Sequence, residues 1–203
     1  MTFEEAATVP QSAILALQGF RGKRPIQPGE RVLINGAGGN VGPFAVQIAK
    51  SFGAEVTGVD RTGKLDMLRS IGADHVIDFT REDFTRSGQR YDRILDLVAR
   101  RSMFDCKRAL RPKGVYVLQG ASTARLLEGA VLGPLISMST STTMRVMWWW
   151  KPFKKEDVLV LKELIADGSV APVIDRRYPL SEVPAALEYL REGNSRGKIV
   201  ITM

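Results

Sequence analysis

A glycine-rich loop between two apolar segments constrains this chain more than any other feature of its sequence. The loop, NGAGGNVG at positions 35–42, follows the β-branched run Arg31–Asn35 and precedes Gly42–Phe52, where apolar residues recur at helical spacing. A glycine loop between a strand and a helix is typical of sites that bind the pyrophosphate of a dinucleotide. The sequence therefore predicts a nucleotide-binding loop, with an ordinary glycine-rich turn as the alternative.

Three positions of the loop have separate predicted roles. Ala37 permits the tight turn, Gly39 leaves the backbone open to a pyrophosphate, and Gly42 lets the helix pack closely on the strand. The first turn of the helix then offers free N–H groups and a partial positive charge to the phosphates. Asp60, which follows Gly42 by 18 residues and comes directly after the next strand-like segment, is placed to accept hydrogen bonds from a ribose hydroxyl.

The residues around Asp60 leave the choice of cofactor open. Its carboxylate favours NAD, because it would repel the 2′-phosphate of NADP. Arg61 and Lys64 favour NADP, since either cation could pair with that phosphate. An exposed surface cation is the alternative for both, and for Lys64 we favour that interpretation. The prediction is NAD or NADP, with a slight lean to NAD.

Strand-like and helix-like segments alternate up to Gly120. Repeated strand–helix–strand units predict an α/β fold of Rossmann type, a doubly wound parallel sheet that binds its ligand at the carboxyl ends of the strands. The expected strands are Arg31–Asn35, Glu55–Val59, His75–Asp78, Tyr91–Val98 and Gly114–Gln119, and the expected helices are Gly42–Phe52, Lys64–Ile71 and Ser102–Leu110.

The pattern weakens after Gly120. Ala121–Thr143 mixes small, polar and apolar residues and has low helical or strand contrast, so it predicts no clear element. The later segments expected are strands at Thr142–Trp150, Val173–Asp175 and Lys198–Thr202, an amphipathic helix at Glu156–Ala166 and a helix capped by Ser181.

Composition excludes several classes of protein. The 203 residues are 44% hydrophobic and 25% charged, as in globular proteins, and no apolar run approaches the ~20 residues of a membrane span. One cysteine cannot form an internal disulfide, and one histidine excludes His-cluster metal sites. The first residues do not resemble a signal peptide, so we expect a cytoplasmic protein. The net charge of +7 is dispersed, which makes nucleic-acid binding a remote alternative.

Several nucleotide-binding enzymes are also excluded. No tyrosine is followed four residues later by lysine, the pair that short-chain dehydrogenases use for proton transfer. Gly42 is followed by Pro43 and not by the Gly-Lys-Ser/Thr of a P-loop. His75 opens a predicted strand, so we interpret it as structural and not as a dehydrogenase base. A methyltransferase stays possible in principle, although Asn35 stands where that class usually carries an acid.

Four stretches, which together extend over nearly the whole chain, carry a resemblance to a known family: FEEAATVP, GERVLINGAGGNVGPFAVQIAK, SIGADHVIDF and YPLSEVPAALEYLREGNSRGKIVI. They resemble the medium-chain dehydrogenase/reductase superfamily and, within it, the zinc-free quinone oxidoreductase (zeta-crystallin-like) branch. Members of that family begin with a GroES-like domain, and this chain is similar to the cofactor-binding half without it. The resemblance implies a connecting segment with a helix at 1–28, a dinucleotide-binding Rossmann domain at 29–170, and a strand–helix–strand segment of the catalytic domain at 171–203.

The resemblance also implies the residues of the site. Cofactor contacts are expected from Gly36, Ala37, Gly39, Asn40, Val41, Gly42, Asp60, Arg61, Lys64, Asp96, Val98, Gly120, Ala121 and Ser122. Phe79 stands where the family often has tyrosine, which weakens the case for NADP. Ala99 stands where the family commonly has glycine, after the fourth strand, and its side chain could crowd the cofactor. No catalytic residue is identified.

No metal is expected. Zinc members of the family carry a cysteine in the connecting region, where this chain has the sequence VPQS at 9–12. Cys106 lies on a predicted helix, and we expect it to pack and not to react.

The tryptophans at 148–150 end the strand predicted at Thr142–Trp150. Because family members often dimerise through this strand, the resemblance implies a homodimer. Coverage of the sheet by these aromatic residues, or packing against the rest of a longer protein, is the alternative. An uncovered edge strand of this composition would otherwise risk aggregation.

Together these features predict a medium-chain, zinc-free, NAD(P)-dependent oxidoreductase. The family's substrates imply a quinone or enone reductase, or an alcohol dehydrogenase-like enzyme, acting on a small carbonyl, enone or quinone. The part present here need not be active by itself. A catalytically silent dinucleotide-binding or regulatory module is the alternative.

Overall fold

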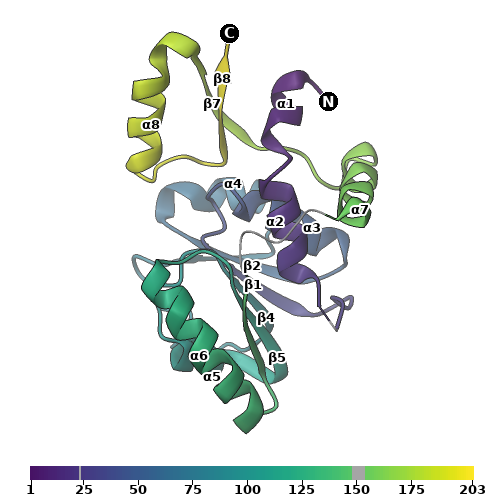
Figure 1. The fold of residues 1–203 in the computed structure, drawn as a ribbon, viewed down its shortest axis with the longest axis vertical. Helices are drawn as coiled ribbons and strands as arrows, with labels where there is room; N and C mark the ends of the chain where they lie inside the picture. The colour runs from purple at the N-terminus through teal and green to yellow at the C-terminus, as the bar shows by residue number, and fades with distance from the viewer. Residues whose placement is uncertain (23, 148–153) are drawn as a thin grey trace.

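A six-stranded parallel sheet forms the centre of the molecule (Figure 1). The structure is a computed structural model and describes residues 1–22, 24–147 and 154–203. The sheet has the order β3-β2-β1-β4-β5-β6, in which the direction of winding reverses between β1 and β4. Its strands are β1 (Arg31–Asn35), β2 (Glu55–Asp60), β3 (His75–Asp78), β4 (Tyr91–Asp96), β5 (Leu110–Leu118) and β6 (Thr143–Val146). The predicted Rossmann-type fold is confirmed.

Both faces of the sheet are buried, each in its own apolar cluster. Along β1, Val32 and Ile34 point into one cluster and Leu33 into the other, because successive side chains alternate across a strand. The helices α2 (Ser12–Phe20), α3 (Gly42–Ser51) and α4 (Leu65–Ser70) cover the first face. The helices α5 (Met103–Arg108) and α6 (Thr123–Ser139) cover the second. The near-continuous apolar runs of the strands reflect this burial on two sides.

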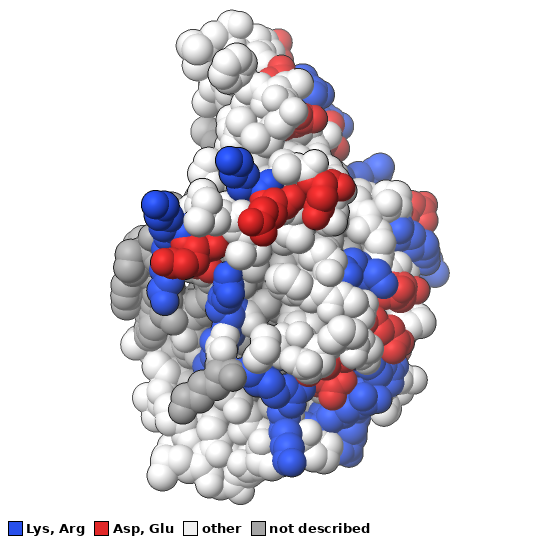
Figure 2. Space-filling view, turned by 90° about the vertical axis from the view of Figure 1, so that its right-hand side faces the viewer, with Lys and Arg blue, Asp and Glu red and all other residues white. Residues whose placement is uncertain are grey.

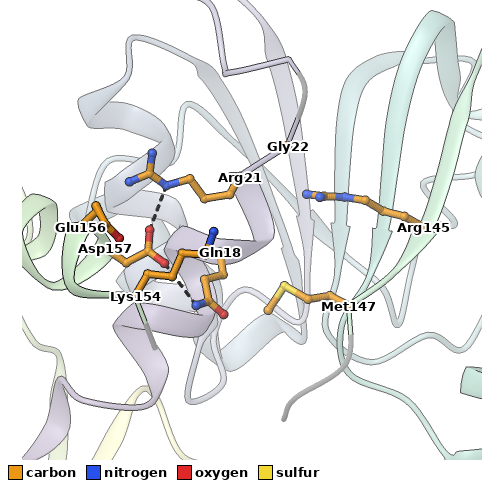
Figure 3. A pocket seen from close by; sticks show the side chains of 8 residues that line it. All are labelled: Gln18, Arg21, Gly22, Arg145, Met147, Lys154, Glu156 and Asp157. Carbon is orange, nitrogen blue, oxygen red and sulfur yellow. Dashed lines mark hydrogen bonds and ion pairs between the residues drawn. The ribbon is translucent and has the colours of Figure 1, made fainter. Parts of the chain in front are cut away.

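The helix α7 (Lys155–Ala166) is tied to α2 by a buried carboxylate (Figure 3). Asp157 is 3% exposed, and its two oxygens accept hydrogen bonds from Gln18 Nε2 at 3.2 Å and Arg21 Nε at 3.0 Å. Leu161 extends the same contact into the first apolar cluster. The helix predicted at Glu156–Ala166 is confirmed, and its partner is α2.

The last part of the chain forms a small unit beside the main sheet, at the top of Figure 1. The strands β7 (Ile174–Pro179) and β8 (Lys198–Thr202) pair in parallel, and α8 (Val183–Arg191) joins them. The N-terminal helix α1 (Phe3–Thr8) lies near this unit, where Arg177 Nε contacts Glu4 Oε2 at 2.6 Å. β7 is longer than the predicted Val173–Asp175 because Arg176, Arg177 and Tyr178 also pair with β8.

The segment expected to lack a clear element contains the longest helix described, and that expectation is wrong. Helix α6 spans 17 residues and packs on the second face of the sheet through Gly129, Gly133 and Ile136. Glycines give no amphipathic signal, and large apolar residues lie on both sides of α6. Leu126, Leu132 and Ile136 pack toward the sheet, whereas Leu127, Val131, Leu135 and Met138 are exposed. Helical periodicity shows in a sequence only when large apolar residues gather on one face, so the pattern was lost.

The strand predicted at Thr142–Trp150 is shorter in the structure. Strand β6 ends at Val146, and Met147 is buried beyond it. The tryptophans at 148–150 lie outside the described residues. Among the helices of the described ranges, none combines the length and the apolar character that crossing a membrane requires.

Truncation of a buried strand residue should cost far more stability than the same change in the small unit. Ile94→Ala, at a fully buried position of β4, should lower the free energy of unfolding by about 3 kcal/mol, because it leaves a cavity that the surroundings cannot fill. Ile201→Ala, at a position of β8 that is 39% exposed, should cost about 1 kcal/mol or less. Urea unfolding followed by circular dichroism checks both, and equal losses would contradict the assigned core.

Candidate functional site

A cavity of about 590 Å³ opens at the carboxyl ends of the central strands, where the order of the sheet reverses. It lies between the glycine loop, the ends of β2, β3 and β4, and the turn after α8. Its lining residues are Asn35, Gly36, Gly39, Asn40, Asp60, Arg61, Lys64, Phe79, Glu82, Asp83, Phe84, Val98, Arg100, Arg101, Leu190, Gly193 and Ser195. Seven of the predicted site residues are brought together here.

The glycine loop has the geometry expected of a phosphate cradle. A Cβ on Gly42 would lie 2.1 Å from the carbonyl oxygen of Ala37, so only glycine allows α3 to approach the strand this closely. A Cβ on Gly39 would meet only the carbonyl oxygen of Gly36, at 3.5 Å, so this backbone is open toward the cavity. Helix α3 begins without a side-chain cap, which leaves its first N–H groups for a ligand.

Asp60 and Lys64 form a buried pair beneath this loop. Asp60 Oδ2 accepts a hydrogen bond from the Gly38 N–H at 2.8 Å, and Oδ1 accepts one from the Arg61 N–H at 2.9 Å. Lys64 Nζ lies 3.9 Å from Asp60 Oδ1 and donates to the Gly38 carbonyl at 3.3 Å. Our preferred interpretation of Lys64 as a surface cation is wrong, because the residue is 6% exposed.

The pair also sets the electrostatics of the loop. Burial lowers the pKa of the Lys64 ammonium, and the carboxylate of Asp60 opposes that effect. Asp60 and Lys64 together hold Gly38 from its N–H and from its carbonyl, so the loop is rigid on the side of β2. Each carboxylate oxygen keeps a lone pair for a further donor, such as a ribose hydroxyl.

Charges of both signs surround the outer part of the cavity. Arg61, Arg100 and Arg101 contribute cations, and Glu82 and Asp83 contribute carboxylates. Arg101 Nη1 lies 3.1 Å from Asp83 Oδ2, and the Arg100 guanidinium stacks 5.4 Å from the centre of the Phe79 ring. Over the molecular face drawn in Figure 2, basic and acidic side chains are likewise interspersed and form no single basic patch.

Part of the lining comes from the C-terminal unit, which the sequence did not suggest. Leu190, Gly193 and Ser195 line the cavity, and Arg61 Nη1 donates to Asn194 Oδ1 at 2.9 Å. Arg61 therefore joins the loop after β2 to the turn after α8. No local motif predicts this contact, because 133 positions separate the two residues.

The structure gives Asp96 a positioning role and no surface for direct contact. Its side chain is fully buried at the end of β4 and accepts four hydrogen bonds. Oδ1 accepts from Asn35 Nδ2 at 2.9 Å, the Val98 N–H at 3.2 Å and the Ala99 N–H at 2.7 Å, and Oδ2 accepts from the Tyr116 hydroxyl at 2.9 Å. One carboxylate thus connects β1, β5 and the loop after β4.

This network resolves the question about Ala99. The residue has a φ of +41°, which is unusual for a side chain other than glycine. Its side chain is only 6% exposed and packs in the second apolar cluster, so it does not crowd the cavity. Val98 lines the cavity instead.

The remaining predicted residues lie around the cavity and do not line it. Ala37 is fully buried, and Val41 and Gly42 begin α3. Gly120 packs against the loop after β4, since a Cβ there would lie 2.0 Å from the Leu97 carbonyl oxygen. Ala121 is half-buried, and Ser122 caps α6 by accepting a hydrogen bond from the Arg125 N–H.

The described residues do not fit a metal site. No three His, Cys, Asp or Glu side chains gather around one point in the described ranges. Cys106 is fully buried, and burial raises the pKa of its thiol. His75 begins β3, and its Nε2 lies 2.8 Å from Glu55 Oε1 at the surface.

A second cavity, of about 680 Å³, lies between α2, β6 and α7 (Figure 3). Arg21, Arg145 and Lys154 are among its lining residues. Arg145 Nη2 donates to the Gly19 carbonyl at 2.8 Å, so this arginine holds α2 against the sheet. The cavity shares no residue with the glycine loop.

The fold and the site define a dinucleotide-binding domain of the Rossmann type. Residues 71–201 match the model of the zinc-binding dehydrogenase family, and the chain belongs to that family. It is the cofactor-binding half of a medium-chain dehydrogenase/reductase, as the sequence motifs implied.

Relatives and solved structures agree with this assignment. The chain is 31% identical to 2-methylene-furan-3-one reductase of Solanum lycopersicum, over 99% of this chain and 47% of that protein. It is 30% identical to the mitochondrial NAD(P)H oxidoreductase RTN4IP1 of Mus musculus, over 100% of this chain and 56% of that protein. The quinone oxidoreductase of Coxiella burnetii superposes with a TM-score of 0.84 at 27% identity, over 100% of this chain and 62% of that one. The chain thus spans about half the length of the curated relatives it matches.

Removing the charge of Asp96 should destabilise the protein in a pH-dependent way. Asp96→Asn replaces an acceptor oxygen by an NH₂ group that faces hydrogen-bond donors. This change should lower the free energy of unfolding by about 2 kcal/mol. Burial raises the pKa of Asp96 above its ordinary value of 3.8. The wild-type carboxyl therefore contributes most to the free energy of unfolding at pH values below 3.8. The difference in unfolding free energy between wild type and variant should therefore shrink as the pH rises above that value.

Chemical unfolding at several pH values between 3 and 7 measures this difference. Asp92→Asn is the matched control, because Asp92 lies at the other end of β4 and accepts from the Arg31 N–H at 2.9 Å. A stability difference for Asp96→Asn that grows with pH would contradict the assignment.

Proposed function

We propose that this chain binds a nicotinamide dinucleotide as the cofactor half of an NAD(P)H-dependent oxidoreductase. The observation that carries the proposal is the open backbone at Gly39, held in place by the Asp60–Lys64 pair inside the cavity at the switch point. The names of the relatives, an enone reductase and an NAD(P)H oxidoreductase, support it.

Each part of the chain has a proposed task. The backbone of Gly39, Asn40 and Val41 and the start of α3 bind the pyrophosphate. Asp60 accepts from the adenine ribose, and Lys64 offsets part of the phosphate charge. Val98 and the segment Gly120–Ser122 bound the space for the second ribose and the nicotinamide. Hydride transfer is the chemistry that the bound cofactor supplies.

The substrate is proposed to be a small enone, quinone or related carbonyl, as the name of the tomato relative suggests. We assign no proton donor in this chain. The zinc-free branch of the family is the proposed one, since the only cysteine is buried and the only histidine lies at the surface.

Calorimetric titration with NADH and NADPH tests the binding proposal. The wild-type chain should bind at least one of them, and Gly39→Asp should abolish binding, because it places a carboxylate where the pyrophosphate lies. Ser51→Asp adds the same charge at the opposite end of α3 and should bind like the wild type. Absence of binding to both cofactors, or equal binding by Gly39→Asp, would overturn the proposal.

The same titrations decide the cofactor. We propose a preference for NAD(H), because a 2′-phosphate would approach the carboxylate of Asp60. Asp60→Asn should then improve the affinity for NADPH relative to NADH by about tenfold, which corresponds to roughly 1.4 kcal/mol of binding free energy. If the wild type binds NADPH more tightly than NADH, and Lys64→Met removes that preference, the proposal of NAD(H) is wrong. Lys64 is then the residue that recognises the 2′-phosphate of NADP(H).

Two further proposals concern the setting of the protein. We propose a homodimer formed through β6, which lies within the strand predicted at Thr142–Trp150 and is an outer strand of the sheet in the described part of the chain. The proposed location is the cytoplasm, in keeping with the single cysteine, although one relative is named as mitochondrial.

A further inference from the structure

The cavity between α2, β6 and α7 is lined by two residues that each carry a buried polar atom without a hydrogen-bond partner (Figure 3). Gln18 is 9% exposed and donates from Nε2 to Asp157, but its Oε1 accepts no hydrogen bond from the described residues. Arg145 donates from Nη2 to the Gly19 carbonyl, whereas its buried Nε meets no acceptor in the described part of the chain. Buried polar atoms are nearly always hydrogen-bonded, so this pair of exceptions calls for an explanation.

The amide of Gln18 cannot rotate to satisfy its own oxygen. Asp157 in its ionised form only accepts hydrogen bonds, so the NH₂ group of Gln18 must face it. The amide oxygen then points away from Asp157, on the side of Met147, which also lines the cavity (Figure 3). A partner for this oxygen has to be a hydrogen-bond donor inside the cavity.

The guanidinium of Arg145 carries a charge that no described carboxylate balances. Its side chain extends from β6 toward α2, across the cavity from Asp157 (Figure 3). Burial lowers the pKa of this guanidinium, and the positive charge of Arg93 lowers it further. A buried charge without an opposite charge is costly, and an anion in the cavity would remove that cost.

The other charged residues of the lining favour an anion with a single charge. Arg21 and Asp157 neutralise one another at 3.0 Å. Arg145 and Lys154 then face Glu156 alone, which leaves an excess of one positive charge among the described lining residues. A carboxylate balances this excess and matches the planar guanidinium, whereas a doubly charged phosphate would exceed it.

The size and the lining of the cavity favour an organic molecule over water. Its volume of about 680 Å³ is many times the ~30 Å³ that one water molecule occupies. Met147, which is 3% exposed, adds a polarisable apolar side chain of the kind that packs well on aromatic rings. An apolar body, a carboxylate and a hydrogen-bond donor are therefore the three features that this cavity fits.

We propose that the cavity between α2, β6 and α7 binds a small apolar carboxylate that also carries a hydroxyl or amide N–H group. Arg145 Nε donates to the carboxylate, and Gln18 Oε1 accepts from the hydroxyl or N–H. This site is separate from the proposed cofactor site, because the two cavities have no lining residue in common.

Calorimetric titration of the wild-type chain with three related probes tests the proposal. Mandelate has the carboxylate, the hydroxyl and an apolar ring, phenylacetate lacks the hydroxyl, and mandelamide lacks the charge. Mandelate should bind, and each of the other two should bind roughly tenfold more weakly or less, because each leaves one buried polar atom without its partner. Absence of mandelate binding, or equal binding of all three probes, would overturn the proposal.

A pair of variants locates the binding. Arg145→Met should weaken mandelate binding by tenfold or more. Arg108→Met is the matched control, since Arg108 is an exposed arginine of α5 on the second face of the sheet, and it should bind mandelate like the wild type. Circular dichroism establishes that both variants fold. Equal mandelate binding by folded Arg145→Met would contradict the assigned site.

A spectroscopic measurement on the wild type keeps the test independent of the folding of Arg145→Met. The Nε–H signal of Arg145 in a ¹H–¹⁵N spectrum is the arginine signal that Arg145→Lys lacks. It should move downfield when mandelate is added, because the Nε–H gains an acceptor. An unchanged signal at saturating mandelate would overturn the proposal. NADH titration of the same samples is a separate readout, because binding at the switch point uses none of these residues.

Discussion

The buried carboxylate of Asp96 is the interaction on which the centre of this molecule depends. It lies at the end of β4, next to the point where the sheet reverses its winding, and its four hydrogen-bond donors come from β1, β5 and the loop that follows β4. A buried carboxylate is stable only when such donors replace water. The same bonds hold Ala99 at a positive φ and turn Val98 toward the cavity. Stability and the shape of the candidate site therefore share one network.

A second constraint acts on the loop that faces this network. Gly42 must be glycine because α3 lies against the Ala37 carbonyl, whereas Gly39 is free of such contacts and open to the cavity. The two glycines look equivalent in the motif, yet one is required for packing and the other for access. Beneath them, Asp60 and Lys64 hold Gly38 from both sides. A rigid loop keeps its N–H groups in position before a ligand arrives, which lowers the ordering cost of binding.

The C-terminal unit and α6 extend the molecule beyond a single Rossmann sheet. The end of α8, through Leu190, and the turn after it, through Gly193 and Ser195, contribute to the cavity, so closure of the candidate site depends on a unit far along the chain. On the second face of the sheet, α6 buries its glycines and exposes Leu127, Val131, Leu135 and Met138. The exposed residues of α6 and the lining of the candidate site thus have no residue in common.

The sequence by itself determined the sheet, the glycine loop and the acid at the end of β2, because these depend on local periodicity and on residue types with narrow backbone or chemical roles. It did not predict α6, whose inward glycines carry no hydrophobic signal, or the burial of Lys64, which depends on how the turn after β2 folds over Gly38. Only the tertiary structure decided that Asp96 supports the cavity from beneath and that Arg61 meets Asn194. Such contacts join residues far apart in the chain, and no spacing rule within one segment contains them.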